Sequence, residues 1–221
     1  MGVGISDDIE RLLTRVQAVS IGVFTEDFSK IHDLIALAKE IGPRIAVIGK
    51  DDPSMGDLDC ILIDDPETFQ MDDIISTRIV EMMDDPEGSI LRAVAVAMDA
   101  MSPTTLVAGI DPGKRPGLAF IADGRLVSIY KSSSSEDAVK RVLLMKKALQ
   151  PGGLLVRLGN GDPLNRDVEL NELLRAGLSV EIVDESMTTT SRRFRDETSA
   201  VAIAITPGSP EKMRLAEYQW I

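Results

Sequence analysis

Three apolar runs near the middle of the chain constrain its fold more than any other feature. Each run has the length and composition of a strand, and each ends in turn residues. The runs are Leu106–Asp111, Leu118–Ala122 and Arg125–Lys131. Asp123 and Gly124 separate the last two, and Asp-Gly between apolar runs is among the strongest hairpin signals. Because the link between the first two runs is also short, we expect the three strands to form an antiparallel meander.

Two further strands are predicted after this meander, at Leu154–Leu158 and Val180–Val183. A helix that runs to Gln150 precedes the first, and a helix at Val168–Ala176 precedes the second. Such helical crossovers make both strands parallel to Leu106–Asp111, with right-handed connections. The prediction is a mixed five-stranded sheet followed by one more helix.

The helix before Gln150 carries two clear signals. Ser134 and Asp137 have the spacing of a capping box at its start. Apolar residues at helical spacing form its expected buried stripe. They are Ala138, Val142, Met145 and Leu149.

Charge divides the chain into two parts. Residues 1–100 hold 21 acidic and 8 basic residues, whereas residues 101–221 hold 15 acidic and 16 basic residues, so the first part carries a charge of -13 and the second a charge of +1. Such asymmetry indicates separate domains. We therefore expect an acidic α/β domain at 1–101 and a second domain at 104–221, joined by the short stretch around Pro103.

The first domain is predicted to be a small Rossmann-like or flavodoxin-like unit with a parallel sheet, because strands and helices alternate along it. Its predicted strands are Val19–Phe24, Ile45–Gly49 and Cys60–Ile63. Its predicted helices are Ile5–Val16, Phe28–Ile41, Met71–Met83 and Ile90–Met101. No phosphate-cradling glycine pattern follows the first strand. Asp64 and Asp65 follow the third strand, and we interpret them as a solvated strand end rather than a phosphoacceptor cluster. This domain is expected to bind a partner, to dimerise or to restrict access to the second domain.

The cysteine content and the absence of targeting patterns indicate the cellular compartment. The one cysteine, Cys60, lies in the apolar stretch CILI and is expected to be a buried core thiol. No disulfide can form within the chain, which suits a reducing compartment. The sequence shows neither a membrane-span pattern nor a signal-peptide pattern, so we predict a cytoplasmic protein.

Acidic residues gather where the predicted parallel strands end. Asp111 ends the first strand, Asp162 follows the fourth, and Asp184 and Glu185 follow the fifth. These strands end at one edge of the sheet, where sites form in open α/β sheets. Carboxylates crowded there repel one another unless a cation lies among them, and hard oxygen ligands suit Mg²⁺ or Mn²⁺. Basic residues near the same edge are candidates for phosphate binding. They are Lys114, Arg115, Arg192, Arg193 and Arg195.

With these motifs in place, residues 104–207 resemble the ribonuclease-H-like superfamily, in its RuvC/YqgF branch. GIDPGKRPGLAF resembles the first-strand motif of RuvC-type resolvases and YqgF-type nucleases. DESMTT, at Asp184–Thr189, is similar to the YqgF-type segment DERLTT. LGNGDPLNRDVEL resembles the fourth-strand region of the YqgF-like domain in Tex transcription factors. DETSAVAIAI, at Asp196–Ile205, resembles the last helix of RuvC.

The resemblance implies a set of metal ligands. Asp111, Glu185 and Asp196 match the family's metal-binding acids and would be the catalytic residues. The second acid of the RuvC helix pair falls on Ser199, and the fourth-strand Glu has no counterpart, because Arg157 lies near its place. Asp162 is a further candidate ligand if its loop folds inward. The implied cofactor is Mg²⁺ or Mn²⁺.

Two functions from different classes remain open. The first is a divalent-metal-dependent endonuclease that acts on structured nucleic acid, DNA or RNA, and the RuvC resemblance adds a homodimer as an expectation. The second is a catalytically degenerate module of the same fold that binds nucleic acid or protein. The sequence lacks the glycine-rich phosphate loops of a third alternative, a phosphotransferase of the actin and sugar-kinase type.

Overall fold

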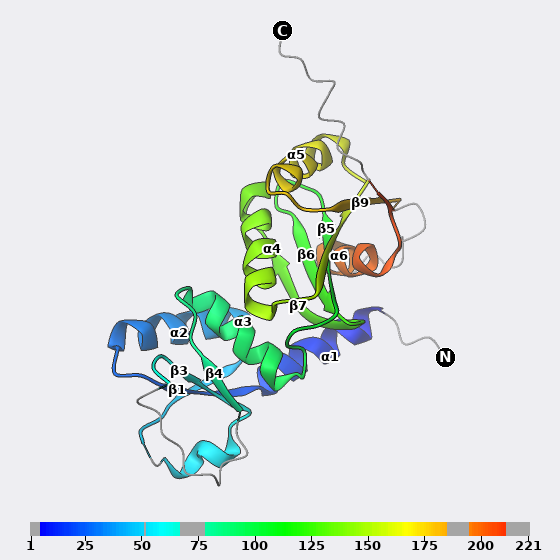
Figure 1. Ribbon diagram of the computed structural model, residues 1–221. Helices are drawn as coiled ribbons and strands as arrows, with labels where there is room; N and C mark the ends of the chain where they lie inside the picture. The colour runs from blue at the N-terminus through cyan, green and yellow to red at the C-terminus, as the bar shows by residue number, and fades with distance from the viewer. Residues whose placement is uncertain (1–4, 51, 67–77, 185–194, 211–221) are drawn as a thin grey trace. The chain divides into compact units, whose positions relative to one another are not determined.

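The computed structural model describes residues 5–50, 52–66, 78–184 and 195–210 (Figure 1). By their internal contacts, the residues group into two compact units. The first unit comprises Met1–Pro103 and Leu144–Pro151, and the second comprises Thr104–Leu143 and Gly152–Ile221. Each unit contains its own sheet, as expected for an α/β chain with two domains. None of the helices within the described ranges has the length and apolarity needed to cross a membrane.

The first unit is built on a four-stranded, fully parallel sheet in the order β2-β1-β3-β4. Its strands are β1 (Ser20–Phe24), β2 (Arg44–Val47), β3 (Cys60–Ile63) and β4 (Arg78–Glu81). Its helices are α1 (Ile5–Ala18), α2 (Phe28–Ile41), the 3₁₀ turn η1 (Pro53–Asp57) and α3 (Pro86–Ala97). The predicted parallel-sheet unit is thus confirmed, with one strand more than expected.

That additional strand corrects a sequence prediction. The helix expected at Met71–Met83 is wrong for the part that the structure describes, because Arg78–Glu81 is strand β4. β4 pairs in parallel with β3, from Cys60 opposite Arg78 to Ile63 opposite Glu81. Ile79 and Val80 are β-branched and favour a strand once a partner is present. Residues 71–77 lie outside the described part of the chain.

Helix α2 follows its predicted bounds, and both of its ends have a local cause. The Asp27 carboxylate caps the start by accepting hydrogen bonds from the amides of Ser29 and Lys30. Gly42 ends the helix in the left-handed conformation at φ 118°, which glycine adopts without a steric penalty. Phe28, the first helical residue, is 85% exposed, whereas Leu34 and Ala38 further along the helix are buried.

Cys60 is a core residue, as predicted. Its side chain is fully buried, and its thiol lies 3.5 Å from the carbonyl oxygen of Ala93. Burial raises the pKa of the Cys60 thiol to about 12. Because only the thiolate reacts, such a thiol is inert while the fold is closed.

We expect native protein at about pH 8 to leave Cys60 unmodified by an aromatic disulfide reagent. Denaturant should release the single thiol for rapid reaction, and thiol titration by absorbance measures both states. A Cys60→Ser variant gives the absorbance expected when no thiol reacts. Rapid modification of the native protein would show that the β3 core opens readily.

The second unit contains a mixed sheet in the order β10-β9-β8-β5-β6-β7. The bounds are β5 (Thr105–Asp111), β6 (Gly117–Ala122), β7 (Arg125–Lys131), β8 (Gly153–Gly159), β9 (Val180–Val183) and β10 (Ser209–Pro210). Its helices are α4 (Ser135–Leu149), of which the part from Leu144 onward groups with the first unit, α5 (Pro163–Arg175) and α6 (Arg195–Ile205). β6 and β7 form the antiparallel meander with β5, and β8 and β9 run parallel to it. The five predicted strands are confirmed, and β10 adds a short antiparallel sixth.

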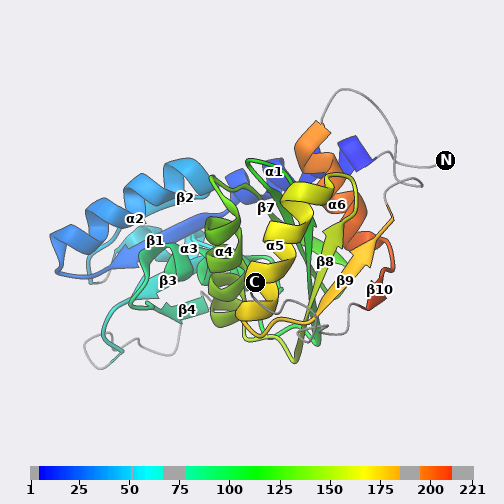
Figure 2. The ribbon, with the colours of Figure 1, turned by 90° about the horizontal axis from the view of Figure 1, so that it is seen from above.

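Helices cover both faces of this sheet, with α4 and α5 on one face and α6 on the other (Figure 1 and Figure 2). The predicted stripe of α4, Ala138 to Leu149, is buried throughout. One bond of the predicted capping box is present, since the Asp137 amide donates to the Ser134 hydroxyl at 3.2 Å, while the Asp137 carboxylate accepts from the Ser133 amide. On the opposite face, Gly109 of β5 allows α6 to approach closely: a Cβ atom there would lie 2.3 Å from the carbonyl oxygen of Ala200.

The two outer margins of the sheet are irregular. At β7, the Asp123-Gly124 turn has both residues in the left-handed region, at φ 44° and 79°, and the register with β6 then shifts between Phe120 and Ile121. At the other margin, β10 is two residues long, and Pro210 lies opposite Glu181. The hairpin predicted from Asp-Gly is thus confirmed, with the turn geometry that this dipeptide favours.

Candidate nucleic-acid and metal site

Asp111 is the last residue of β5, at the carboxyl end of a strand with neighbours on both sides. Side chains alternate between the two faces of a strand. Leu106, Ala108 and Ile110 are fully buried on the face of α4 and α5, whereas Gly109 lies under α6. Asp111 therefore belongs to the α6 face, where it is half-buried at the strand end.

The register of the meander places Lys131 on the same face of the sheet as Asp111. Asp111 pairs with Gly117 of β6, and Gly117 pairs with Lys131 of β7. Directly paired residues of antiparallel strands project on the same side of a sheet. Asp111 and Lys131 thus flank a glycine that has no side chain to fill the space between them.

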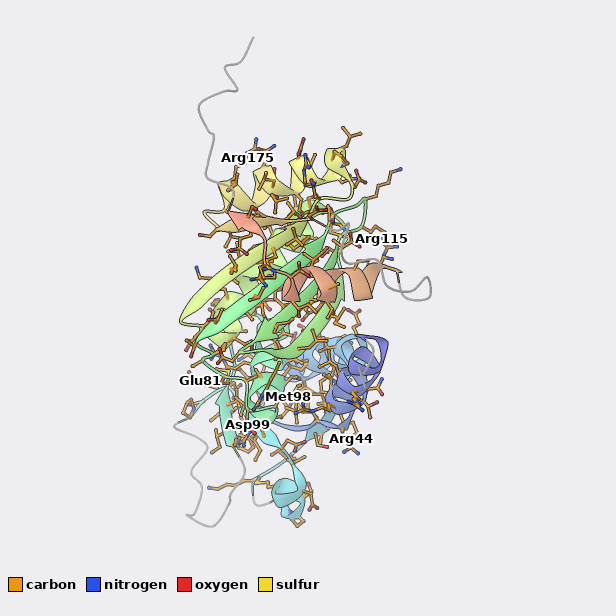
Figure 3. All side chains as sticks on the ribbon, turned by 90° about the vertical axis from the view of Figure 1, so that its right-hand side faces the viewer. Arg44, Glu81, Met98, Asp99, Arg115 and Arg175 are labelled. Atoms are coloured by element: carbon orange, nitrogen blue, oxygen red, sulfur yellow. The ribbon has the colours of Figure 1, made fainter. Side chains whose placement is uncertain are left out.

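A hollow of about 320 Å³ opens at this point of the second unit. Its lining is Asp111, Pro112, Gly113, Lys114, Arg115, Gly117 and Lys131. The charged part of the lining is one carboxylate and three cationic groups, so the hollow favours an anion. Figure 3 labels Arg115, which lies on the loop between β5 and β6. Lys114, Arg115 and Lys131 are exposed, and the Asp111 carboxylate is less so.

Lys131 is the lining residue that sequence reasoning missed. The strand Arg125–Lys131 was predicted with its correct bounds, but its last residue was taken only as a strand end. Its side-chain direction depends on the β6–β7 register. The Asp123-Gly124 turn carried part of that information, yet the later register shift made a simple count along the hairpin unreliable.

Arg157 of β8 contributes to the packing of α6. Its guanidinium donates to the Glu181 carboxylate at 3.0 Å and to the carbonyl oxygen of Ala204 at 2.7 Å. Glu181 also accepts from the Gly208 amide at 3.3 Å. Arg157 thus ties the end of α6 to β8 and β9.

Asp162 has a local structural role at the start of α5. Its carboxylate accepts hydrogen bonds from the Asn165 amide at 3.3 Å and from the Asn165 side chain at 2.6 Å. The Asn165 side-chain bond lowers the pKa of Asp162 most strongly. Asp162 therefore caps α5, and its part in metal binding stays a prediction.

The remaining predicted site residues fall at or beyond the limits of the described chain. Glu185, Arg192 and Arg193 lie outside the described residues. Arg195 and Asp196 begin α6, but only their backbone is described, whereas Ser199 is half-buried one turn later. Among the described residues, no group of three or more His, Cys, Asp or Glu side chains is placed to hold a metal ion. The set Asp111, Glu185 and Asp196 thus stays a prediction.

In the first unit, Asp64 is more constrained than a solvated strand end. One of its carboxylate oxygens accepts a hydrogen bond from the Thr25 hydroxyl, and the same oxygen lies 3.5 Å from the Lys30 ammonium. Asp64 thereby links the carboxyl ends of β1 and β3 to α2. This arrangement explains why an acidic residue follows β3 without invoking a ligand.

Comparison with known proteins leaves the family of this chain open. No protein-family model matches it, and no curated protein matches it. Among solved structures, the RuvC structure from Thermus thermophilus aligns with 20% sequence identity and a TM-score of 0.34. The alignment covers 48% of this chain and 99% of that chain. An identity and a TM-score at this level assign neither a family nor a function.

Proposed function

We propose that residues 104–221 form a ribonuclease-H-like domain that acts as a divalent-metal-dependent nuclease on structured nucleic acid. The observation that carries the proposal is the hollow at Asp111, where a carboxylate at the end of an internal strand lies beside three cationic side chains. Such a lining accommodates a phosphodiester together with a cation at Asp111. The strand order supports the same domain type, because a meander precedes two parallel crossover strands.

The described residues fit a divalent ion in part. Asp111 offers a hard oxygen ligand at the hollow, and Glu185 and Asp196 are proposed to complete the set. A bound Mg²⁺ or Mn²⁺ would lower the pKa of a coordinated water and neutralise charge on the phosphate. Lys114, Arg115, Arg192, Arg193 and Arg195 are proposed to contact the nucleic-acid backbone.

A second candidate function is nucleic-acid binding without cleavage. It is favoured by two positions where the RuvC pattern has an acidic residue and this chain does not. Arg157 lies near one and is engaged with Glu181, and Ser199 falls on the other, where a neutral hydroxyl is a weaker Mg²⁺ ligand. A module of this kind would bind nucleic acid through the cationic lining of the hollow and would not cleave it.

Incubation of the full chain with Mn²⁺ and labelled nucleic acids separates the two functions. The panel comprises four-way DNA junctions, flaps, single strands and structured RNA. We expect cleavage of at least one structured member, and Asp111→Asn should reduce its rate by 10²-fold or more, on the order of the loss when an electrostatic group is removed from a catalytic site. The matched control is Asp167→Asn, since Asp167 is an exposed acid of α5 paired with Arg166.

Retention of the wild-type rate in Asp111→Asn would contradict the proposed site. Binding without cleavage in the wild-type chain would establish the second function. Failure to bind and to cleave any member would exclude both and direct attention to the acidic first unit.

A further inference from the structure

We propose that Lys131 holds one backbone phosphate of the nucleic acid in the hollow, across Gly117 from Asp111. This inference rests on the proposed function and adds to it a phosphate subsite on β7. It starts from the β5–β6–β7 register, which places Asp111, Gly117 and Lys131 in one row on the α6 face.

The spacing of this row leaves room for a ligand beside Lys131 and Asp111. Adjacent strands lie about 4.8 Å apart, so the backbones of Asp111 and Lys131 are separated by roughly 10 Å across β6. Gly117 contributes no side chain to the gap, and the hollow occupies it. A phosphate in that space can face Lys131 on one side and a cation held by Asp111 on the other.

Lys131 differs from the other two cations of the hollow in how its backbone is held. Lys114 and Arg115 belong to the loop between β5 and β6, whereas Lys131 ends a paired strand. The next residue, Ser132, is fully buried, and its amide donates to the Pro116 carbonyl at 2.8 Å. The backbone of a lysine on a strand end fixed in this way is in place before the ligand arrives, which favours a specific contact.

The turn into α4 adds further restraint just beyond Lys131. The Ser133 amide donates to the Asp137 carboxylate at 2.8 Å, and the Asp137 amide donates to the Ser134 hydroxyl. These bonds join the end of β7 to the first turn of a long helix. The chain just beyond Lys131 is therefore held by hydrogen bonds that the amides of Ser132, Ser133 and Asp137 donate.

The alternative role for Lys131 is to neutralise Asp111 within the protein. The two roles predict different salt dependence. A lysine that neutralises a phosphate releases a condensed counterion, and each such contact contributes about 0.9 to the slope of log K against log salt on duplex DNA. A lysine that only balances Asp111 leaves that slope unchanged.

The test measures binding of the full chain to a labelled four-way DNA junction across a monovalent salt series, with Ca²⁺ in place of Mn²⁺. Lys131→Gln is expected to weaken binding about tenfold near 0.1 M salt and to reduce the slope by about 0.9, while Lys131→Arg keeps the slope. Lys140→Gln is the matched control, because Lys140 is an exposed lysine of α4, on the opposite face of the sheet.

An unchanged slope in Lys131→Gln would overturn the subsite. If cleavage still depended on Asp111 in that case, the nuclease proposal would stand and only the role of Lys131 would fail. A wild-type chain that neither binds nor cleaves any nucleic acid of the panel would overturn the proposed function and, with it, this inference. An equal loss of slope in Lys140→Gln would show general charge attraction and would also overturn the subsite.

Discussion

Replacing Glu169 with glutamine is expected to remove about 3 kcal/mol of pH dependence from the stability of the second unit. Glu169 lies on α5 and is fully buried. Within the described part of the chain, neither of its carboxylate oxygens makes a hydrogen bond of good geometry. Burial raises the pKa of Glu169 to about 7, repulsion from Glu172 adds to the shift, and the nearby Ser135 hydroxyl offsets part of it.

The direction of the effect follows from proton binding. Below about pH 4.5, the carboxyl group is protonated in both the folded and the unfolded chain, and it has no influence on the pH dependence. Between about pH 4.5 and 7, the unfolded chain loses the proton while the folded chain keeps it, so stability falls as pH rises. Above about pH 7, the loss is complete and constant.

Urea unfolding of wild type and Glu169→Gln at several pH values measures this effect. The difference in unfolding free energy should move in favour of glutamine by about 3 kcal/mol between pH 4.5 and about pH 8. The control is Glu136→Gln, which removes an exposed carboxylate from the first turn of α4. A difference that is independent of pH would mean that Glu169 is ionised in the folded protein.

Gly109→Ala is expected to destabilise the second unit by about 3 kcal/mol or more, because the added methyl group overpacks the contact between β5 and α6. A Cβ atom at Gly109 would lie 2.3 Å from the Ala200 carbonyl oxygen and 2.6 Å from the Ala204 amide nitrogen. Both are backbone atoms, so a side-chain rotation cannot relieve the clash. The helix would have to move away from the sheet, and α6 carries Asp196.

Gly113→Ala is the matched control for this prediction. Gly113 lies in the loop after β5, and a Cβ atom there would meet nothing within 4 Å. Its effect on stability should stay within about 0.5 kcal/mol. Urea unfolding followed by circular dichroism compares the two variants with wild type. Equal stability of Gly109→Ala and Gly113→Ala would contradict the close approach of α6.

Periodicity along the chain was sufficient for most elements and insufficient for several, including the start of α3 at Pro86 instead of Ile90. The helix Phe28–Ile41 and the strand Cys60–Ile63 have the predicted bounds, since strong local signals start and stop them. β4 was missed because four residues are too short to show alternation, and a parallel partner decided their conformation. α5 begins at Pro163 rather than Val168, because Asp162 acts as its N-cap with proline at the first helical position. β10 has two residues and no sequence signal of its own.

The candidate site shows the same limit. Asp111 was placed correctly at a strand end, because strand position follows from local pattern. Lys131 and Glu169 required tertiary information: the face of a lysine depends on register, and the burial of a glutamate depends on the neighbouring helix. Sequence alone therefore identifies the acid at the edge of the sheet and leaves the surrounding charges undetermined.

The irregular margins of the second sheet bear on how copies of this chain can associate. An open strand edge invites a strand of another molecule, and native sheets oppose this with proline, bulges and charged residues. At one margin, Pro210 has no amide proton to donate, and at the other, the register shift and the terminal charges of Arg125 and Lys131 disturb the edge. Strand-by-strand polymerisation is thereby disfavoured. A stable dimer formed through the described part of the second unit would therefore use side-chain surfaces and not a continuous intermolecular sheet.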